Sequence, residues 1–141
     1  MERKETSQLC DALMHASNIE TYLKNNSDQF SNRDVAELLT ELFEIKHITK
    51  AELAKRAGIS EVYLHQVFAG RRKPSRDRLL CICLGLQATL EETQRLLQQS
   101  VYAPLYPKNR RDSIIAYGIL HQMEATAIND KLFTEKEETL F

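Results

Sequence analysis

The segment from Thr49 to Ser75 constrains the fold more than any other part of this chain. A Thr-x-x-Glu box, Thr49 to Glu52, should open a short helix. That helix should end at Gly58, because glycine readily takes the left-handed conformation that follows a helix. Ser60 is a good N-cap for a second short helix, which should stop at Gly70. Small and apolar residues stand where the two helices should cross: Leu53, Ala54, Ile59, Leu64 and Val67.

Helical spacing of apolar residues continues along most of the chain. The expected helices cover residues 6–16, 19–25, about 32–46, 49–57 and 60–69, others beginning at Ser75, Thr89 and Asn109, and a last one over 124–133. Ser31 is the expected cap of the third helix. With only 4 Gly and 3 Pro, the composition also favours helix. We therefore expect an all-α fold, a compact multi-helix bundle with extra helices at both ends.

A length of 141 residues suggests one domain. We divide the chain into an N-terminal helical extension over 1–30, a core over 31–100 and a C-terminal helical extension over 101–141 that packs on the core. Two prolines keep residues 102–107 out of regular helix. The charged tail over 134–138 is expected to fray, although Leu140 and Phe141 offer apolar side chains for docking.

The charge is unevenly distributed along the chain. The formal net charge is −1, with 19 Lys and Arg against 20 Asp and Glu, which excludes a uniformly basic coat for nucleic acid. By region, residues 1–45 carry a net −5, residues 46–78 a net +6 and residues 79–141 a net −2. The basic island coincides with the two short helices. A chance fluctuation of charge across solvated helix faces is the alternative, and this coincidence counts against it.

The sequence gives little support for a membrane, secreted, disulfide-bonded, metal-binding or catalytic protein. No apolar run reaches the length of a membrane span, and no secretory signal follows Met1. Three cysteines argue against a disulfide framework, and Cys81-x-Cys83 lacks the spacing of a zinc site. No phosphate-binding loop or nucleophile motif is present. We expect a cytoplasmic protein that is not an enzyme, does not contact a membrane and needs no metal or cofactor.

Three short motifs together carry a family resemblance. The pattern E-L-A-x-x-A-G-I-S over 52–60, then L-x-x-V over 64–67 and G-x-x-x-P-S over 70–75, resembles the lambda-repressor-like (XRE) family of bacterial and phage helix-turn-helix proteins. The resemblance covers about residues 35–97. It implies a five-helix core and a transcriptional regulator of double-stranded DNA, with the helix that starts at Ser60 reading the major groove.

The resemblance also implies which residues meet DNA. The base-facing candidates are Glu61, Val62, Tyr63 and Gln66; Gln suits adenine and Glu suits cytosine N4. The phosphate candidates are Lys50, Ser60, Arg71, Arg72 and Lys73. Alternatives stay open, because residues 71–73 could be a solvated turn and Tyr63 could cover a helix junction. A smaller basic cluster consists of Lys108, Arg110 and Arg111. We interpret it as exposed surface at the start of a helix in preference to an extension of the DNA contact.

Two departures from the family pattern keep a second function open. Phe68 occupies a position where the family often has Glu, and Phe is expected to pack rather than bond. Glu61 places an acid on the presumed DNA face. The alternative is a protein-interaction module with weak or no DNA binding and a protein partner. We also expect a homodimer, in which five terminal apolar residues either pair subunits or complete the monomer core: Ile114, Ile115, Ile119, Ile128 and Leu132.

Overall fold

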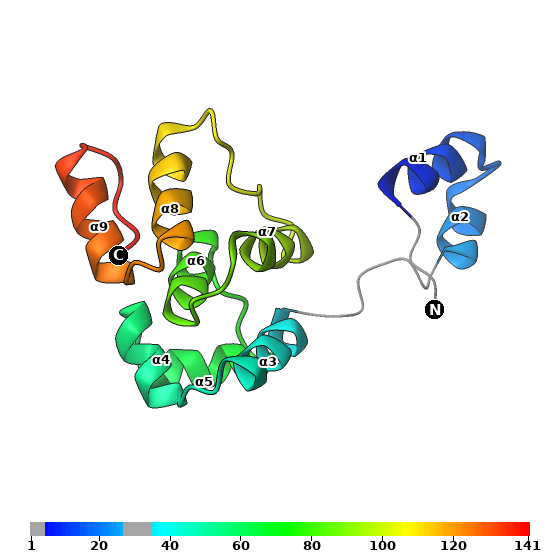
Figure 1. Cartoon of the computed structure of the whole chain (residues 1–141). Coiled ribbons are helices and arrows are strands. Elements are labelled where there is room, and N and C mark those ends of the chain that lie inside the picture. Colours follow the sequence, from blue (N-terminus) through cyan, green and yellow to red (C-terminus); the bar gives the residue numbers. More distant parts are fainter. Residues whose placement is uncertain (1–4, 27–34) are drawn as a thin grey trace. The chain divides into compact units, whose positions relative to one another are not determined.

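The computed structural model describes residues 5–26 and 35–141, and the chain divides into two compact units, 1–32 and 33–141. The described residues form nine helices and no strand, which confirms the all-α prediction (Figure 1). The predicted cap Ser31 lies outside the described residues. The smaller unit contains α1 (Thr6–His15) and α2 (Ile19–Asn25), and neither of these helices includes a buried residue.

The larger unit is built around α6 (Arg76–Gly85). Every residue from Leu79 to Gly85 is buried, including both Cys81 and Cys83. A Cβ placed on Gly85 would lie 2.8 Å from Cδ1 of Leu53, so α4 (Lys50–Ala57) packs against α6 at close range. Three more helices pack around this pair: α3 (Val35–Lys46), α5 (Glu61–Phe68) and α7 (Leu90–Gln99).

Local capping decides where these helices begin. The side chains of Thr49, Ser60, Ser75 and Thr89 each accept a hydrogen bond from the backbone N–H three residues later. The box at Thr89 is complete, because Glu92 accepts from the Thr89 N–H at 2.8 Å. At Thr49 only half of the predicted box forms. The Glu52 carboxylate there accepts from Arg56 one turn later, at 3.2 Å, instead of turning back to the cap.

The C-terminal helices complete the core of the larger unit. Helix α8 (Arg110–Leu120) lies beside α9 (Ala125–Thr134), and α9 also contacts α4 and α6 (Figure 1). Four of the five terminal apolar residues considered for subunit pairing are buried within this unit: Ile115, Ile119, Ile128 and Leu132. Ile114 is partly buried. Their burial leaves little of that apolar surface to a partner.

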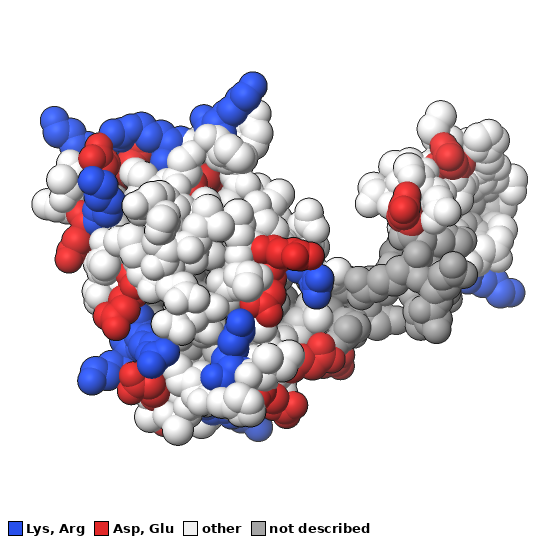
Figure 2. Space-filling model, viewed as in Figure 1, with Lys and Arg blue, Asp and Glu red and all other residues white. Residues whose placement is uncertain are grey.

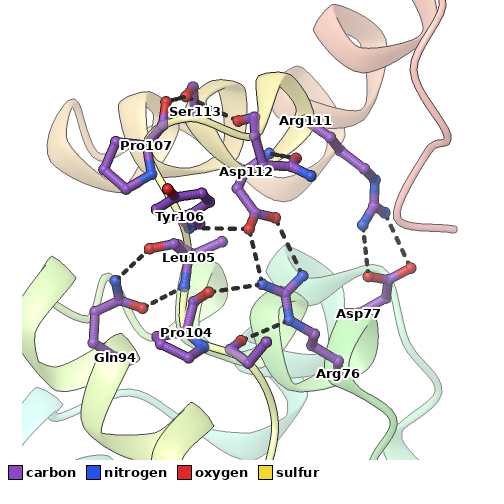
Figure 3. Close-up of polar contacts among 12 residues, drawn as sticks. Arg76, Asp77, Gln94, Pro104, Leu105, Tyr106, Pro107, Arg111, Asp112 and Ser113 are labelled. Carbon is purple, nitrogen blue, oxygen red and sulfur yellow. Dashed lines mark hydrogen bonds and ion pairs between the residues drawn. The ribbon is translucent and has the colours of Figure 1, made fainter.

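A polar network fastens the extended segment before α8 to the core (Figure 3). Asp112 is only 7% exposed and pairs with Arg76, two nitrogens to two oxygens at 3.2 Å each. The Asp112 carboxylate also accepts from the backbone N–H of Tyr106. The Gln94 amide binds both the N–H and the carbonyl of Leu105. The proline-rich segment therefore serves as a structural joint between α6, α7 and α8.

The tail after α9 is held in place, so the prediction that it frays is wrong. The Arg110 guanidinium bonds to Glu135 and Glu137, and both bonds raise the pKa of Arg110. Arg111 pairs with Asp77 on α6 and also bonds to backbone carbonyls of the tail. Figure 2 shows the resulting mixture of blue and red atoms over the region of α8 and α9. Arg110 and Arg111 thus hold the tail against α8.

Candidate nucleic-acid interface

The turn between α4 and α5 has the predicted geometry. Gly58 takes a left-handed conformation with φ of 70°, and the N–H of Ile59 donates to the carbonyl of Ala54 at 3.1 Å. Ser60 then caps α5, its Oγ accepting from the Tyr63 N–H at 3.1 Å. Ala54 and Ala57 are buried and small, which allows the two helices to approach closely. The result is a short helix, a three-residue turn and a second short helix.

One side of α5 faces solvent. Val62 is 69% exposed and Glu61 and His65 are also exposed, while Gln66 is half-buried. Val62, His65 and Gln66 line a groove of about 810 Å³ between α3 and α5, together with Lys50 and Arg71. The sequence prediction missed His65 as a member of this face. The spacing 62, 65, 66 would have found it, because residues three and four apart share one side of a helix.

Tyr63 lies on the opposite side of α5 from the solvent. Its side chain is only 7% exposed, although the sequence prediction assigned it to the bases. Two guanidinium groups cover its ring: Cζ of Arg72 lies 4.8 Å and Cζ of Arg78 lies 4.4 Å from the ring centroid. Tyr63 therefore fits the alternative left open by the sequence, a ring that fills a helix junction.

The cations of the basic island fall into two groups. Three of the nine pair with carboxylates: Lys46 with Glu92, Arg56 with Glu52, and Arg76 with Asp112. No carboxylate of the described residues pairs with the other six, which are Lys50, Lys55, Arg71, Arg72, Lys73 and Arg78. These six lie on α4, in the segment after α5 and at the start of α6. Positive charge without an internal partner is thus concentrated around α5.

Both departures from the family pattern have a structural explanation. Phe68 packs on Phe43, with ring centroids 5.3 Å apart, and Lys50 lies over the Phe68 ring at 5.4 Å. Phe68 thus packs, as the sequence suggests, and does not bond. The Glu61 carboxylate lies 3.7 Å from Nε2 of His65, one turn along α5, and not beside an arginine. His65 is therefore the side chain that the Glu61 carboxylate meets on this face.

Two further observations concern the part of the chain that the structure describes. No three His, Cys, Asp or Glu side chains there gather closely enough to hold a metal ion. No helix among those residues is long and apolar enough to cross a membrane.

The paired short helices, their turn and the surrounding cations define a helix-turn-helix domain. Residues 34–96 match a family model described as a helix-turn-helix domain. The chain is also similar to uncharacterized HTH-type transcriptional regulators from two Mycobacterium tuberculosis strains, CDC 1551 / Oshkosh and ATCC 25618 / H37Rv. Each is 33% identical over 97 residues, covering 67% of this chain and 68% of the relative. The chain belongs to the helix-turn-helix family. No solved structure matches it.

Proposed function

We propose that this protein is a DNA-binding transcriptional regulator that reads the major groove with α5, the helix that starts at Ser60. Membership of the helix-turn-helix family and the regulator names of its relatives support the proposal. The observation that carries it is the set of six cations around α5 that pair with no carboxylate of residues 5–26 and 35–141. Among the described cations of the larger unit outside the basic island, Arg95, Arg110, Arg111 and Lys131 pair with carboxylates, so the charge available to phosphates is densest near α5.

Within this proposal the exposed face of α5 meets the bases. Gln66 suits the paired donor and acceptor of adenine, and Val62 suits a thymine methyl. Glu61 and the newly found His65 complete that face. The residues proposed to bind phosphates are Lys50, Ser60, Arg71, Arg72 and Lys73. Ser60 can serve although it caps α5, because its Oγ accepts from Tyr63 while its hydroxyl proton can still donate.

We further propose a homodimer acting on DNA in the cytoplasm, in a binding and not a catalytic role. One recognition helix buries too little surface for tight specific binding. A dimer would place two copies of α5 about one helical turn apart on the duplex, roughly 34–36 Å. Assignment to the lambda-repressor-like group within the family is part of the same proposal, and its motif over 52–75 supports it.

The test is a titration of labelled duplex DNA between about 50 and 200 mM salt. Each phosphate contact contributes about 0.9 to the slope of log affinity against log salt, so losing two should reduce that slope by about 1.8. We expect this reduction for Arg71→Glu with Arg72→Glu. The matched control is Lys108→Glu with Lys136→Glu, which reverses the same amount of charge on two exposed lysines outside the basic island.

Three results discriminate between the functions. A wild-type chain that binds no duplex at low salt would refute DNA binding. Equal effects of the two double variants would show that only total charge matters and would refute the site. If the chain binds no duplex but retains a protein partner that Glu61→Ala or Val62→Ala releases, the protein-interaction module is the better description of the exposed face of α5.

A further inference from the structure

Several unpaired cations near α5 rest on aromatic rings. Besides the two arginines over Tyr63, Nζ of Lys73 lies 4.7 Å from the ring centroid of Tyr102. The Tyr102 hydroxyl donates to the carbonyl of Pro74 at 2.6 Å, which fixes that ring beside the segment after α5. An aromatic face attracts a cation electrostatically, but unlike a carboxylate it leaves the positive charge in place. The rings therefore orient these cations without neutralising them.

Tyr63 is the aromatic ring in this region that lies against two cations. It is in the first turn of α5, where its backbone N–H is bound to the Ser60 cap, and its side chain is 7% exposed. Arg72 reaches the ring from the segment after α5, and Arg78 reaches it from the first turn of α6. The backbone at Arg78 is also held in place, because its N–H donates to Oγ of Ser75, the N-cap of α6. One buried ring thus gathers two exposed guanidinium groups from separate elements.

The chemistry of this arrangement favours a phosphate. Two guanidinium groups on one ring repel each other, so an anion between or beside them lowers the energy of both. Stacking on a ring also leaves all five N–H donors of each arginine open, and those donors match phosphate oxygens. No carboxylate of the described residues forms an ion pair with Arg72 or Arg78. The site is therefore charged, oriented and without an internal anion.

We propose that Arg72 and Arg78 form a clamp for a phosphate of the DNA backbone beside α5, and that Tyr63 is its positioning residue. Arg78 is a phosphate-binding residue that the sequence motif did not indicate. This inference rests on the proposed DNA-binding function and adds to it one contact from α6. It also explains why a tyrosine at a base-facing motif position is buried: it acts on DNA through the two arginines.

The experiment titrates a fluorescein-labelled random-sequence duplex with the full chain at several salt concentrations. Arg78→Gln should reduce the salt slope by about 0.9, so that the affinity loss between 50 and 200 mM shrinks by a factor of about 3.5. The matched control is Arg95→Gln, because Arg95 is an exposed arginine on α7 beside Glu91, and its slope should stay that of the wild type. Tyr63→Phe keeps the ring and should also leave the slope unchanged, whereas Tyr63→Leu should reduce it by as much as about 1.8.

Folding of each variant is checked by circular dichroism. If Tyr63→Leu does not fold, Tyr63→Met replaces it, and Arg72→Gln combined with Arg78→Gln should reduce the slope by about 1.8. The clamp is overturned if the wild type binds duplex but Arg78→Gln matches Arg95→Gln. The positioning role is overturned if ringless variants keep the slope of Tyr63→Phe. A wild type that binds no duplex overturns the proposed function itself, and the clamp with it.

Discussion

Replacement of Gly118 by alanine should expose how tightly the C-terminal helices are fitted to each other. A Cβ on Gly118 would overlap Cδ1 of Ile128 and lie 2.5 Å from its Cγ1, closer than real atoms approach. Such overpacking costs about 1–3 kcal/mol, and a contact this short belongs at or above the upper end. Alanine is favoured over glycine in a helix by about 1 kcal/mol. We expect a net loss of about 2 kcal/mol, or roughly 6–10 °C in Tm.

A second substitution, Ile128→Ala, should relieve the clash that Gly118→Ala creates. Ile128→Ala removes Cγ1 and Cδ1 and leaves the Ile128 Cβ position 3.8 Å from the new methyl, an ordinary contact. Alone, Ile128→Ala should cost about 2–5 kcal/mol because it opens a cavity. In the double variant the new methyl fills part of that cavity. The double variant should therefore lose about 1–3 kcal/mol less free energy of unfolding than the two single variants lose together. Urea unfolding of the four proteins measures this coupling. Additive losses, or a neutral Gly118→Ala, would refute the close crossing of α8 and α9.

Three further changes test other features. Glu61→Gln should raise affinity for random duplex, because it removes a carboxylate from the exposed face of α5; unchanged affinity would place that face away from DNA. Burial raises the pKa of Cys81 and of Cys83 from 9.0 to about 12, so the folded chain holds these protons more tightly than the unfolded chain. Stability should therefore fall above pH 9, by at most about 1.4 kcal/mol per pH unit for each thiol, and replacing both by alanine should flatten the urea-midpoint profile relative to Cys10→Ala. Val101 is 87% exposed with a left-handed φ of 62°, so Val101→Gly should raise Tm by a few degrees; a lower Tm would contradict backbone strain there.

Helix positions could be predicted because their signals are local. A side chain at Ser60 or Ser75 needs only the N–H three residues later, and the chain supplies that partner wherever it starts a helix. The joints between helices could not be predicted in this way. Arg76 meets Asp112 36 residues later, and Asp77 meets Arg111 34 residues later. No sequence spacing marks such a pair. The contacts of Arg110 and Arg111 with the tail also span 25 to 28 residues, so the sequence gives no sign that the tail is held.

The site was only partly predictable for a related reason. A motif assigns positions along α5, but the apolar neighbours decide which positions face inward. Tyr63 lies beside Leu64 and four residues before Val67, and all three are buried together. His65 lies on the other side, one turn from Glu61. Helical geometry applied to the buried residues would have exchanged Tyr63 for His65 on the exposed face of α5.

The ion pairs also set a limit on how strongly salt can act on this protein. Within the basic island, Lys46, Arg56 and Arg76 are already bound to carboxylates, and two of those carboxylates, on Glu92 and Asp112, come from outside the island. Six cations remain near α5, so the salt slope of DNA binding should not exceed about 5.4 for each subunit. A steeper measured slope would require further cations: those that the larger unit keeps paired, the exposed Lys108 and Lys136, or cations of residues 1–34. A slope near 1.8 would instead mean that only two cations reach phosphates, the number that the Tyr63-supported pair would supply alone. The slope thus counts, in solution, how many of the unpaired cations the duplex contacts.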